Sequence, residues 1–290
     1  MVQIVLALLA ALLFALGSVL QQRAGLTAPS HGPKSSLVLR MARRPLWMLG
    51  FAIDVIGFVA QAAALGEGRL AVVQPLLISS VVFALPLGAV LTGQRIGRQE
   101  VLSALVVVLA LVALLQLARP AGGRDQAPVA QWLVAFGACA VVVAPLVLAR
   151  DRGSSSERAV VVAAAAGILF ALSAALTKAT VGELHDGIVH LVTSWPPYAL
   201  AVIGYASLTL NQIALDTGRL AAVITVSTAV DPATSIVLGL TLFEESLNGS
   251  GAARAGALVA LISALGGMAA LARAGTGSAG HPGGLNPPAP

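Results

Sequence analysis

The sequence predicts an all-α polytopic membrane protein with about nine transmembrane helices in two inverted-topology repeats. Three observations predict this fold. Of the 290 residues, 58% are hydrophobic and only 10% are charged, the apolar residues form long continuous runs, and one stretch of ten residues occurs nearly twice. A soluble domain carries about 25% charged residues, so this chain has too few to cover a soluble surface. A β-barrel would alternate polar and apolar residues over about 10 positions, unlike these runs.

Nine apolar runs are near or above the roughly 20 residues that cross the hydrocarbon core of a bilayer. They cover residues 2–20, 46–65, 70–93, 99–118, 129–149, 158–178, 196–215, 220–243 and 252–273. The stretch 183–195 is too short and too polar to span, and we expect an interfacial segment there. The tail 274–290 consists mostly of Gly, Pro, Ala and Ser, and we expect it to be disordered.

The first run is predicted to be a retained helix rather than a cleaved signal peptide. No positively charged region precedes it. It also has an internal counterpart, because Leu13–Leu16 with Leu20 matches Leu169–Leu172 with Leu176. A cleaved peptide is not expected to be half of a repeat.

Lys and Arg are unevenly distributed over the loops. With the N-terminus outside, the inner loops hold 12 of them and the outer loops 5. This bias predicts an N-out, C-in protein of the plasma membrane, with the lipid bilayer as its main partner. The basic residues are spread over five loops instead of one patch, so we expect no nucleic-acid partner despite the net charge of +5.

The near-duplicated stretch is ALGEGRLAVV at Ala64–Val73 and ALDTGRLAAV at Ala214–Val223, identical at seven of ten positions. The match continues, since Leu85–Ile96 aligns with Ile236–Leu247 and Gln61 with Asn211. The first four spans thus correspond to the last four, each five spans apart. Five is odd, so the copies enter the membrane in opposite senses, as in many secondary transporters. The predicted organisation is a first half at 1–120, a linker helix and loop at 121–157, a second half at 158–273 and the tail at 274–290.

Short motifs within the two halves resemble those of the drug/metabolite transporter superfamily. They are a Gly-Arg-Leu turn before the third helix of a half and a G-E-R-L-like turn before the fourth, represented by Gly93–Ile96 and Glu244–Leu247. Nine spans instead of ten, together with Asn211–Val223, are closer to the NIPA-type magnesium transporter branch than to other EamA-like members. The resemblance implies secondary transport, and for the NIPA-type branch it implies magnesium as the solute.

Two carboxylates, Asp54 and Asp231, lie near the centres of predicted spans. A charged side chain there costs about 2.5–3.5 kcal/mol on insertion scales, so such residues are functional candidates by default. Helical spacing places further polar and small residues beside them, and Pro232 removes the backbone donor for a carbonyl one turn earlier. The candidate substrate- or ion-binding residues are Asp54, Gln61, Gln74, Asn211, Thr228, Asp231 and Ser235. In a magnesium carrier, Asp54 and Asp231 would be metal ligands.

Each of these features also has a structural explanation. Stripes of Gly and Ser commonly serve helix packing in bilayers. Polar residues at span ends, such as Gln21, Gln22 and Lys178, serve as anchors near the interface. The carboxylates at helix ends, Asp216, Glu244 and Glu245, are expected to be solvated, and Cys139 to serve packing. None of the four histidines is assigned a role.

The leading hypothesis is therefore a transporter of a small solute that works by alternating access, with a cation or proton bound by the carboxylates. The path would run between the spans at 46–65, 70–93, 196–215 and 220–243. Magnesium transport is the first alternative, and a membrane scaffold or sensor without transport is the second. No nucleophile–base pair or set of metal ligands at useful spacing predicts an enzyme, and no cofactor is expected.

Overall fold

The computed structural model describes residues 1–26, 44–93, 96–118, 120–149, 155–215, 220–247 and 250–278. Within these residues, eight helices are long and apolar enough to cross a membrane, and Val226–Leu242 is a shorter apolar helix. The predicted all-α class is confirmed. The elements are α1 Val2–Leu26, α3 Pro45–Gly66, α4 Leu70–Leu77, α5 Ser79–Thr92, α6 Arg98–Ala118, β1 Pro120–Gly122, α7 Val129–Ala149, α8 Ser155–His185, α9 Ile188–Thr193, α10 Pro196–Leu215, α11 Leu220–Leu242, β2 Glu245–Leu247 and α12 Gly251–Ser278.

Local sequence explains two helix ends. α3 begins with Pro45 directly after Arg44, whose backbone is extended. Proline suits the first helical position because its missing N–H would have no partner there. α5 ends at Gly93, which has a φ of 72°. Glycine adopts this left-handed conformation without the steric penalty of a Cβ atom, so it is a favoured helix terminator.

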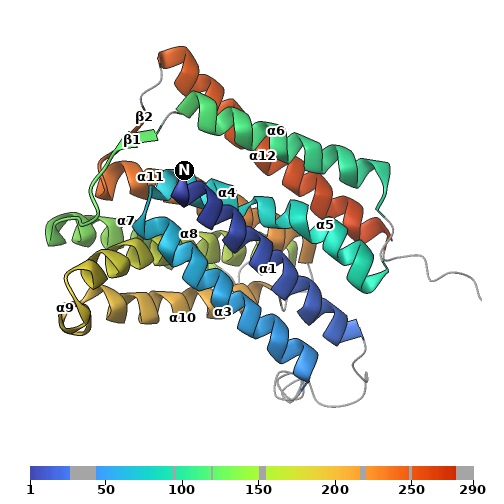
Figure 1. Ribbon diagram of the computed structural model, residues 1–290, viewed down its shortest axis with the longest axis horizontal. Helices are drawn as coiled ribbons and strands as arrows, with labels where there is room; N and C mark the ends of the chain where they lie inside the picture. Colours follow the sequence, from blue (N-terminus) through green and yellow to red (C-terminus); the bar gives the residue numbers. More distant parts are fainter. Residues whose placement is uncertain are drawn as a thin grey trace, which may run out of the picture.

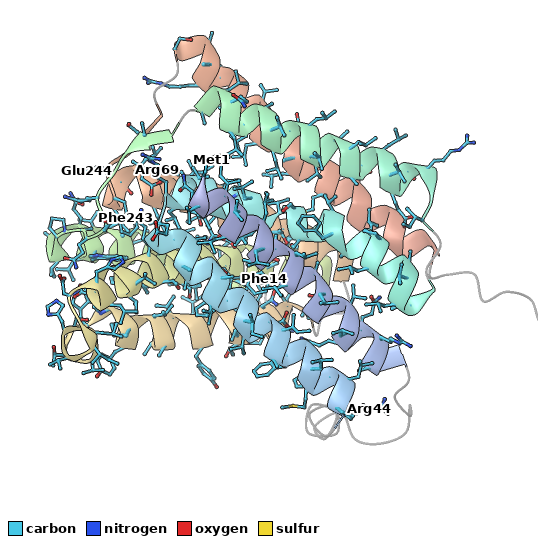
Figure 2. The ribbon with its side chains drawn as sticks, in the orientation of Figure 1. Met1, Phe14, Arg44, Arg69, Phe243 and Glu244 are labelled. Atoms are coloured by element: carbon cyan, nitrogen blue, oxygen red, sulfur yellow. The ribbon has the colours of Figure 1, made fainter. Side chains whose placement is uncertain are left out.

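The helices pack as two groups joined through shared contacts (Figure 1). α1 lies against α3, α4 and α5, while α8 lies against α10 and α11. The groups are connected where α4 packs against α11 and where α3 and α4 contact α8, and α6 runs beside α12. α7 lies against α8 and α11. The N-terminus, Arg69, Phe243 and Glu244 gather at one end of the bundle, and Arg44 lies at the other (Figure 2).

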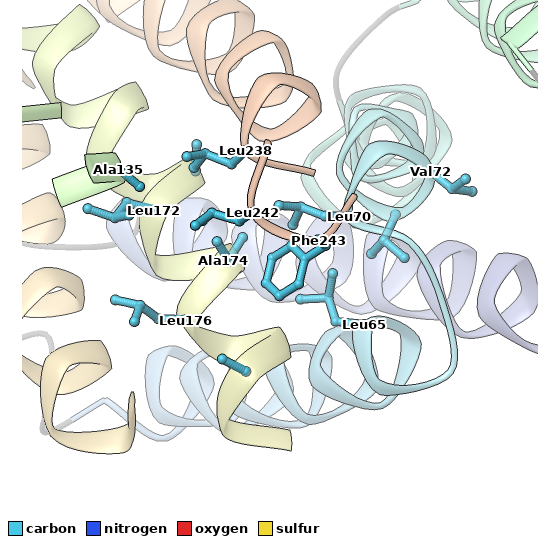
Figure 3. Packing of buried hydrophobic residues seen from close by; sticks show 14 of the residues in the cluster. Leu65, Leu70, Val72, Ala135, Leu172, Ala174, Leu176, Leu238, Leu242 and Phe243 are labelled. Carbon is cyan, nitrogen blue, oxygen red and sulfur yellow. The ribbon is translucent and has the colours of Figure 1, made fainter. Parts of the chain in front are cut away.

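The largest buried cluster forms at the end of the bundle where the chain turns from α3 into α4. Figure 3 shows the Phe243 ring between Leu65 and Leu70 of the first group and Leu242 beside it. Trp132 of α7 joins this cluster with its ring centroid 6.1 Å from that of Phe243. Large aliphatic side chains elsewhere point outward, as Leu109 and Val141 do, which suits helices surrounded by lipid.

One predicted span is interrupted. The run 70–93 forms two helices, α4 and α5, separated by a turn at Ile78. The Ser79 hydroxyl donates a hydrogen bond of 2.6 Å to the Leu76 carbonyl, and the Ile78 amide bonds to the Pro75 carbonyl three residues earlier. Such local hydrogen bonds compete with the regular helical ladder. Leu70–Thr92 is nevertheless long and apolar enough to cross a membrane, so the predicted span is confirmed, with a turn at Ile78 inside it.

Three helices extend beyond their predicted ends. α1 continues from the predicted end at residue 20 to Leu26. α8 continues to His185, so Lys178 lies inside it and not at its end. α12 continues to Ser278, so residues 274–278 are helical, whereas residues 279–290 of the expected disordered tail lie outside the described residues. The segment 183–195 does not span, as predicted, and contains the end of α8 and the short helix α9.

A two-stranded antiparallel sheet connects distant parts of the chain. β1 follows α6 and pairs with β2, with Ala121 opposite Ser246. The sequence did not predict these strands, because three residues each are too few to produce a recognisable alternation. The sheet ties the segment after the first half to the turn between α11 and α12.

Candidate functional site

Asp54 lies in the middle of α3, at its contact with α1. Gln21 of α1 donates a hydrogen bond from Nε2 to Oδ2 of Asp54. Two glycines, Gly17 and Gly50, permit the close approach: a Cβ atom built on Gly50 would lie 2.8 Å from the Gly17 carbonyl oxygen. Gly17 and Gly50 therefore let α1 and α3 pack closely, as expected for small residues in membrane helices. The close contact also holds the Asp54 carboxylate against the Gln21 amide of the neighbouring helix.

Asp231 lies midway along α11 and has a partner on its own helix. The hydroxyl of Ser235, one turn later, donates to Oδ1 of Asp231 at 3.1 Å. Ser235 is completely buried. α11 remains one helix through Pro232, although this proline cannot donate to the Thr228 carbonyl. Thr228 makes contacts of its own. The structure thus brings two of the predicted residues, Asp231 and Ser235, into direct contact.

The three predicted amide side chains lie on three different helices. Gln61 of α3 and Asn211 of α10 are partly buried, and Gln74 of α4 is buried. α4 packs against α11, so Gln74 and the Asp231–Ser235 pair belong to neighbouring helices. Asp54, in contrast, accepts its hydrogen bond from Gln21 of α1. The binding of a cation or proton by the two carboxylates stays a prediction.

A groove of about 590 Å³ lies between α7 and α11, with Ile168 of α8 also in its wall. This volume is within the usual range of small-molecule pockets. The lining is mostly apolar, with Gln131, Thr234 and Thr241 as polar members. None of the seven predicted residues lines it. Of the helices expected to line the transport path, only α11 contributes residues to this groove. The path itself stays a prediction.

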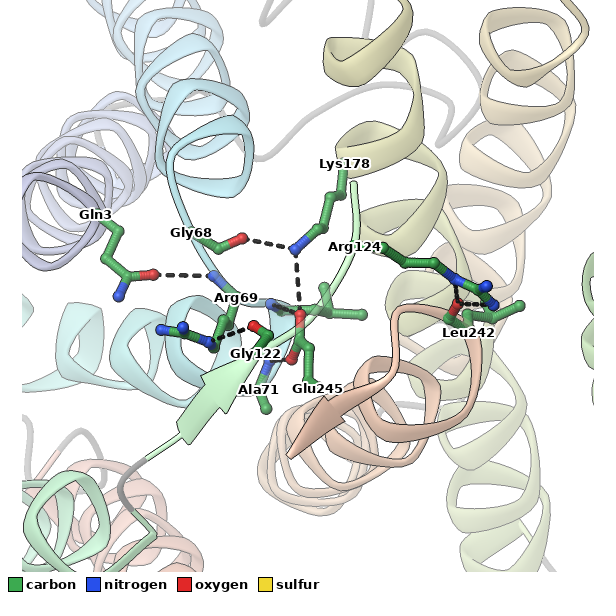
Figure 4. Close-up of polar contacts among 10 residues, drawn as sticks. Gln3, Gly68, Arg69, Ala71, Gly122, Arg124, Lys178, Leu242 and Glu245 are labelled. Carbon is green, nitrogen blue, oxygen red and sulfur yellow. Dashed lines mark hydrogen bonds and ion pairs between the residues drawn. The ribbon is translucent and has the colours of Figure 1, made fainter. Parts of the chain in front are cut away.

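The most buried ion pair of the described residues joins Lys178 and Glu245. From the sequence, Lys178 was expected to be an anchor near the interface and Glu245 a solvated carboxylate, and both expectations were wrong. The side chains are 3% and 0% exposed, and Lys178 Nζ lies 3.2 Å from Glu245 Oε1 (Figure 4). A signal was present: Lys178 is the single charged residue between Arg158 and Glu183. Glu244, by contrast, is exposed as expected and pairs with Arg124 at 3.2 Å.

A second polar cluster lies at the corner between α8 and α9. The imidazole Nε2 of His190 is 2.7 Å from Oε2 of Glu183. With Asp186, these residues place three possible metal-ligand atoms within 4.8 Å of one another. Asp186 and His190 are exposed, and the contact between His190 and Glu183 is enough to bring the three groups together. His190 therefore has a polar partner, which the sequence did not suggest.

The long apolar helices, their outward-facing aliphatic side chains and the buried polar contacts between helices define a multi-pass α-helical membrane protein. The chain is similar to an uncharacterised protein of Corynebacterium glutamicum, with 29% identity over 244 residues that cover 83% of this chain and 84% of the relative. No protein-family model matches the chain. No solved structure matches it.

Proposed function

We propose that this protein is a secondary transporter of a small solute that works by alternating access between two inverted repeats. The first half would comprise the helices from α1 to α6, and the second half those from α8 to α12. α7 would be a linker helix without a counterpart. In such folds the solute site lies near the middle of the membrane, between the halves, and rocking of the halves exposes it to each side in turn.

The matching of helix contacts between the halves carries this proposal. The contact of α1 with α3 has a counterpart in α8 with α10, and that of α1 with α4 and α5 has one in α8 with α11. α5 meets α6 as α11 meets α12. Between the halves, the largest contacts, α6 with α12 and α4 with α11, join corresponding helices to each other, whereas the smaller contact of α3 with α8 does not. This is the arrangement that a pseudo-two-fold axis through these two pairs would produce.

Polar residues at the matched contacts support the same proposal. In the first half, Asp54 of α3 faces Gly17 of α1. The aligned positions in the second half are Gly204 and Ser173, and a Cβ atom built on Gly204 would lie 3.8 Å from Ser173 Oγ. Each half thus places one polar group and one glycine at its main helix contact. In the first half the polar group is ionisable, and in the second it is neutral.

The two carboxylates are the groups that we assign to ion coupling. An acidic side chain within a membrane span is costly, so a role for it in binding a cation or a proton is the default hypothesis. Asp231 and Ser235 offer oxygen atoms, which hard cations such as magnesium prefer. The same carboxylate suits proton exchange, and magnesium transport is therefore the specific alternative within this proposal. We further propose an N-out, C-in orientation in the plasma membrane.

Flux measurements in proteoliposomes test the carboxylate mechanism. Asp54→Asn and Asp231→Asn should each lower flux of the transported solute at least tenfold, while Asp186→Asn, an exposed carboxylate on the turn after α8, should leave it unchanged. A panel of magnesium, amino acids and cationic drugs, each with and without a pH gradient, separates the magnesium carrier from the proton-coupled exporter. Wild-type protein that moves none of these solutes would favour the scaffold or sensor. Full flux in both variants would refute the assigned role of the carboxylates.

A further inference from the structure

The buried pair of Lys178 and Glu245 is held by backbone groups as well as by its own charges. The Glu245 carboxylate accepts hydrogen bonds from the Leu70 amide at 2.7 Å and the Ala71 amide at 2.9 Å. These are the first two residues of α4, so the carboxylate satisfies amides that have no partner within the helix. Lys178 donates a second hydrogen bond, of 2.7 Å, to the Gly68 carbonyl. Each charged group therefore contacts the turn between α3 and α4.

The packing around the pair excludes water. Lys178 Nζ lies 4.9 Å from the centroid of the Phe243 ring, within the range of a cation–π contact. Gly239 of α11 leaves the space that the carboxylate occupies, because a Cβ atom there would lie 2.5 Å from Glu245 Oε2. Charges removed from water in this way attract each other strongly, and removal of one leaves the other unpaired.

The pair joins the two halves at one end of the bundle. Gly68, Leu70 and Ala71 belong to the first half, whereas Lys178 of α8 and Glu245 of β2 belong to the second (Figure 4). Two hydrogen bonds of Arg69 lie next to the pair. The Arg69 amide donates to Gln3 Oε1 and its guanidinium Nε donates to the Gly122 carbonyl, both at 2.9 Å.

A further contact closes the same end of the bundle. The guanidinium of Arg124 donates two hydrogen bonds of 3.0 Å to the Leu242 carbonyl. Taken with the buried pair, these bonds connect the turn after α3, the sheet and the end of α11.

The aligned positions carry no second copy of the pair. Under the alignment of the halves, the position of Glu245 is occupied by Gln94 and that of Lys178 by Gln22, and both are neutral. The pair is therefore a feature of the second half and not of the repeat.

We propose that Lys178 and Glu245 form a lock that closes the α4 end of the transport path, and that the lock separates and re-forms in each transport cycle. The proposal rests on the proposed transport function. Separation moves the first turn of α4 away from the carboxylate and admits water, which solvates both ions. An ion pair suits this task because its partners interact strongly when dry and weakly when exposed.

Cysteine accessibility tests the lock without knowledge of the solute. Leu70 is completely buried behind the pair. We expect Leu70→Cys, in a Cys139→Ala background, to react slowly with a membrane-impermeant maleimide from the side of the membrane on which α4 begins. Adding Glu245→Gln should raise the reaction rate at least tenfold. Glu244→Gln is the matched control, because its carboxylate is adjacent but exposed, and it should change the rate less than twofold.

Further variants separate an open lock from a misfolded protein. The double variant Lys178→Met with Glu245→Gln contains no unpaired buried charge, so it should remain monodisperse on size exclusion and still label rapidly. Slow labelling of this folded double variant, or equal rates for the Glu244 and Glu245 variants, would overturn the lock. Rapid labelling of the Glu245 variant supports the lock even if the wild-type protein moves none of the tested solutes. Absence of flux would count against the transport function and not against the lock.

Discussion

Replacing Gly50 by alanine tests the close contact of α1 with α3 that positions Asp54. A Cβ atom at Gly50 would lie 2.8 Å from the Gly17 carbonyl oxygen and 2.9 Å from Gln21 Cγ. The oxygen belongs to the backbone of a helix, so it cannot move away alone. Ordinary contacts begin at 3.4 Å, and the helices would have to separate by roughly 0.6 Å.

The cost can be estimated from a matched glycine. Overpacking of this kind destabilises a protein by about 1–3 kcal/mol. Alanine also favours a helix over glycine by about 1 kcal/mol, which opposes the loss. Gly137 of α7 also lies in a helix, but nothing lies within 4 Å of a Cβ atom built on it. Gly137→Ala therefore gains helix propensity without a steric clash. The two variants should therefore differ by about 1–3 kcal/mol, with the Gly50 variant less stable.

Thermal unfolding in detergent, followed by size exclusion, measures this difference. At about 2–4 °C per kcal/mol, the Tm of Gly50→Ala should be at least 2 °C below that of Gly137→Ala. Separation of the helices also weakens the hydrogen bond from Gln21 to Asp54, so flux should fall with Tm if Asp54 binds the coupling ion. Equal Tm values for the two variants would refute the close contact of α1 and α3.

Two further substitutions probe the α4 end of the bundle. Gly239→Ala should lower the Tm by several degrees and speed the labelling of Leu70→Cys, because the new methyl group would displace the Glu245 carboxylate; an unchanged labelling rate would contradict the role of Gly239. Trp132→Ala should cost about 3–5 kcal/mol, since its side chain is buried, whereas Leu133→Ala, which removes an outward-facing side chain, should have a much smaller effect on Tm. Similar Tm losses for these two variants would show that the buried cluster around Trp132 and Phe243 does not stabilise this end of the bundle.

Much of the helical fold could be predicted from the sequence because apolar length is a local property. Backbone polar groups must be satisfied within each segment in a bilayer, so a long apolar run forms a helix whatever surrounds it. The run at 196–215 forms a helix over those same residues. Apolar length did not predict two details. It did not show the turn at Ile78 inside the span 70–93, and it did not show that α8 continues beyond its apolar run.

Part of the candidate site could likewise be predicted from the sequence, and part could not. Intramembrane carboxylates are visible in a sequence because charge is rare in apolar runs, and Asp54 and Asp231 were found by that rule. Glu245 was assigned to solvent because it follows a helix end, where a carboxylate usually meets water. Its partners Leu70 and Ala71 are 175 and 174 positions away, too distant for any spacing argument. Residues 216–219, within the second copy of the repeat, lie outside the described residues, as do Gln94 and Arg95.

The sequence by itself determined that the chain has long apolar helices suited to a membrane, roughly where they lie, and that a ten-residue stretch recurs 150 positions apart. These properties follow from composition and order alone. Only the tertiary structure decided which charges are buried together, because burial depends on what the rest of the chain places over a side chain. It placed the first copy of GRLA at the Lys178–Glu245 pair, with Gly68 accepting from the ammonium and Leu70 and Ala71 donating to the carboxylate.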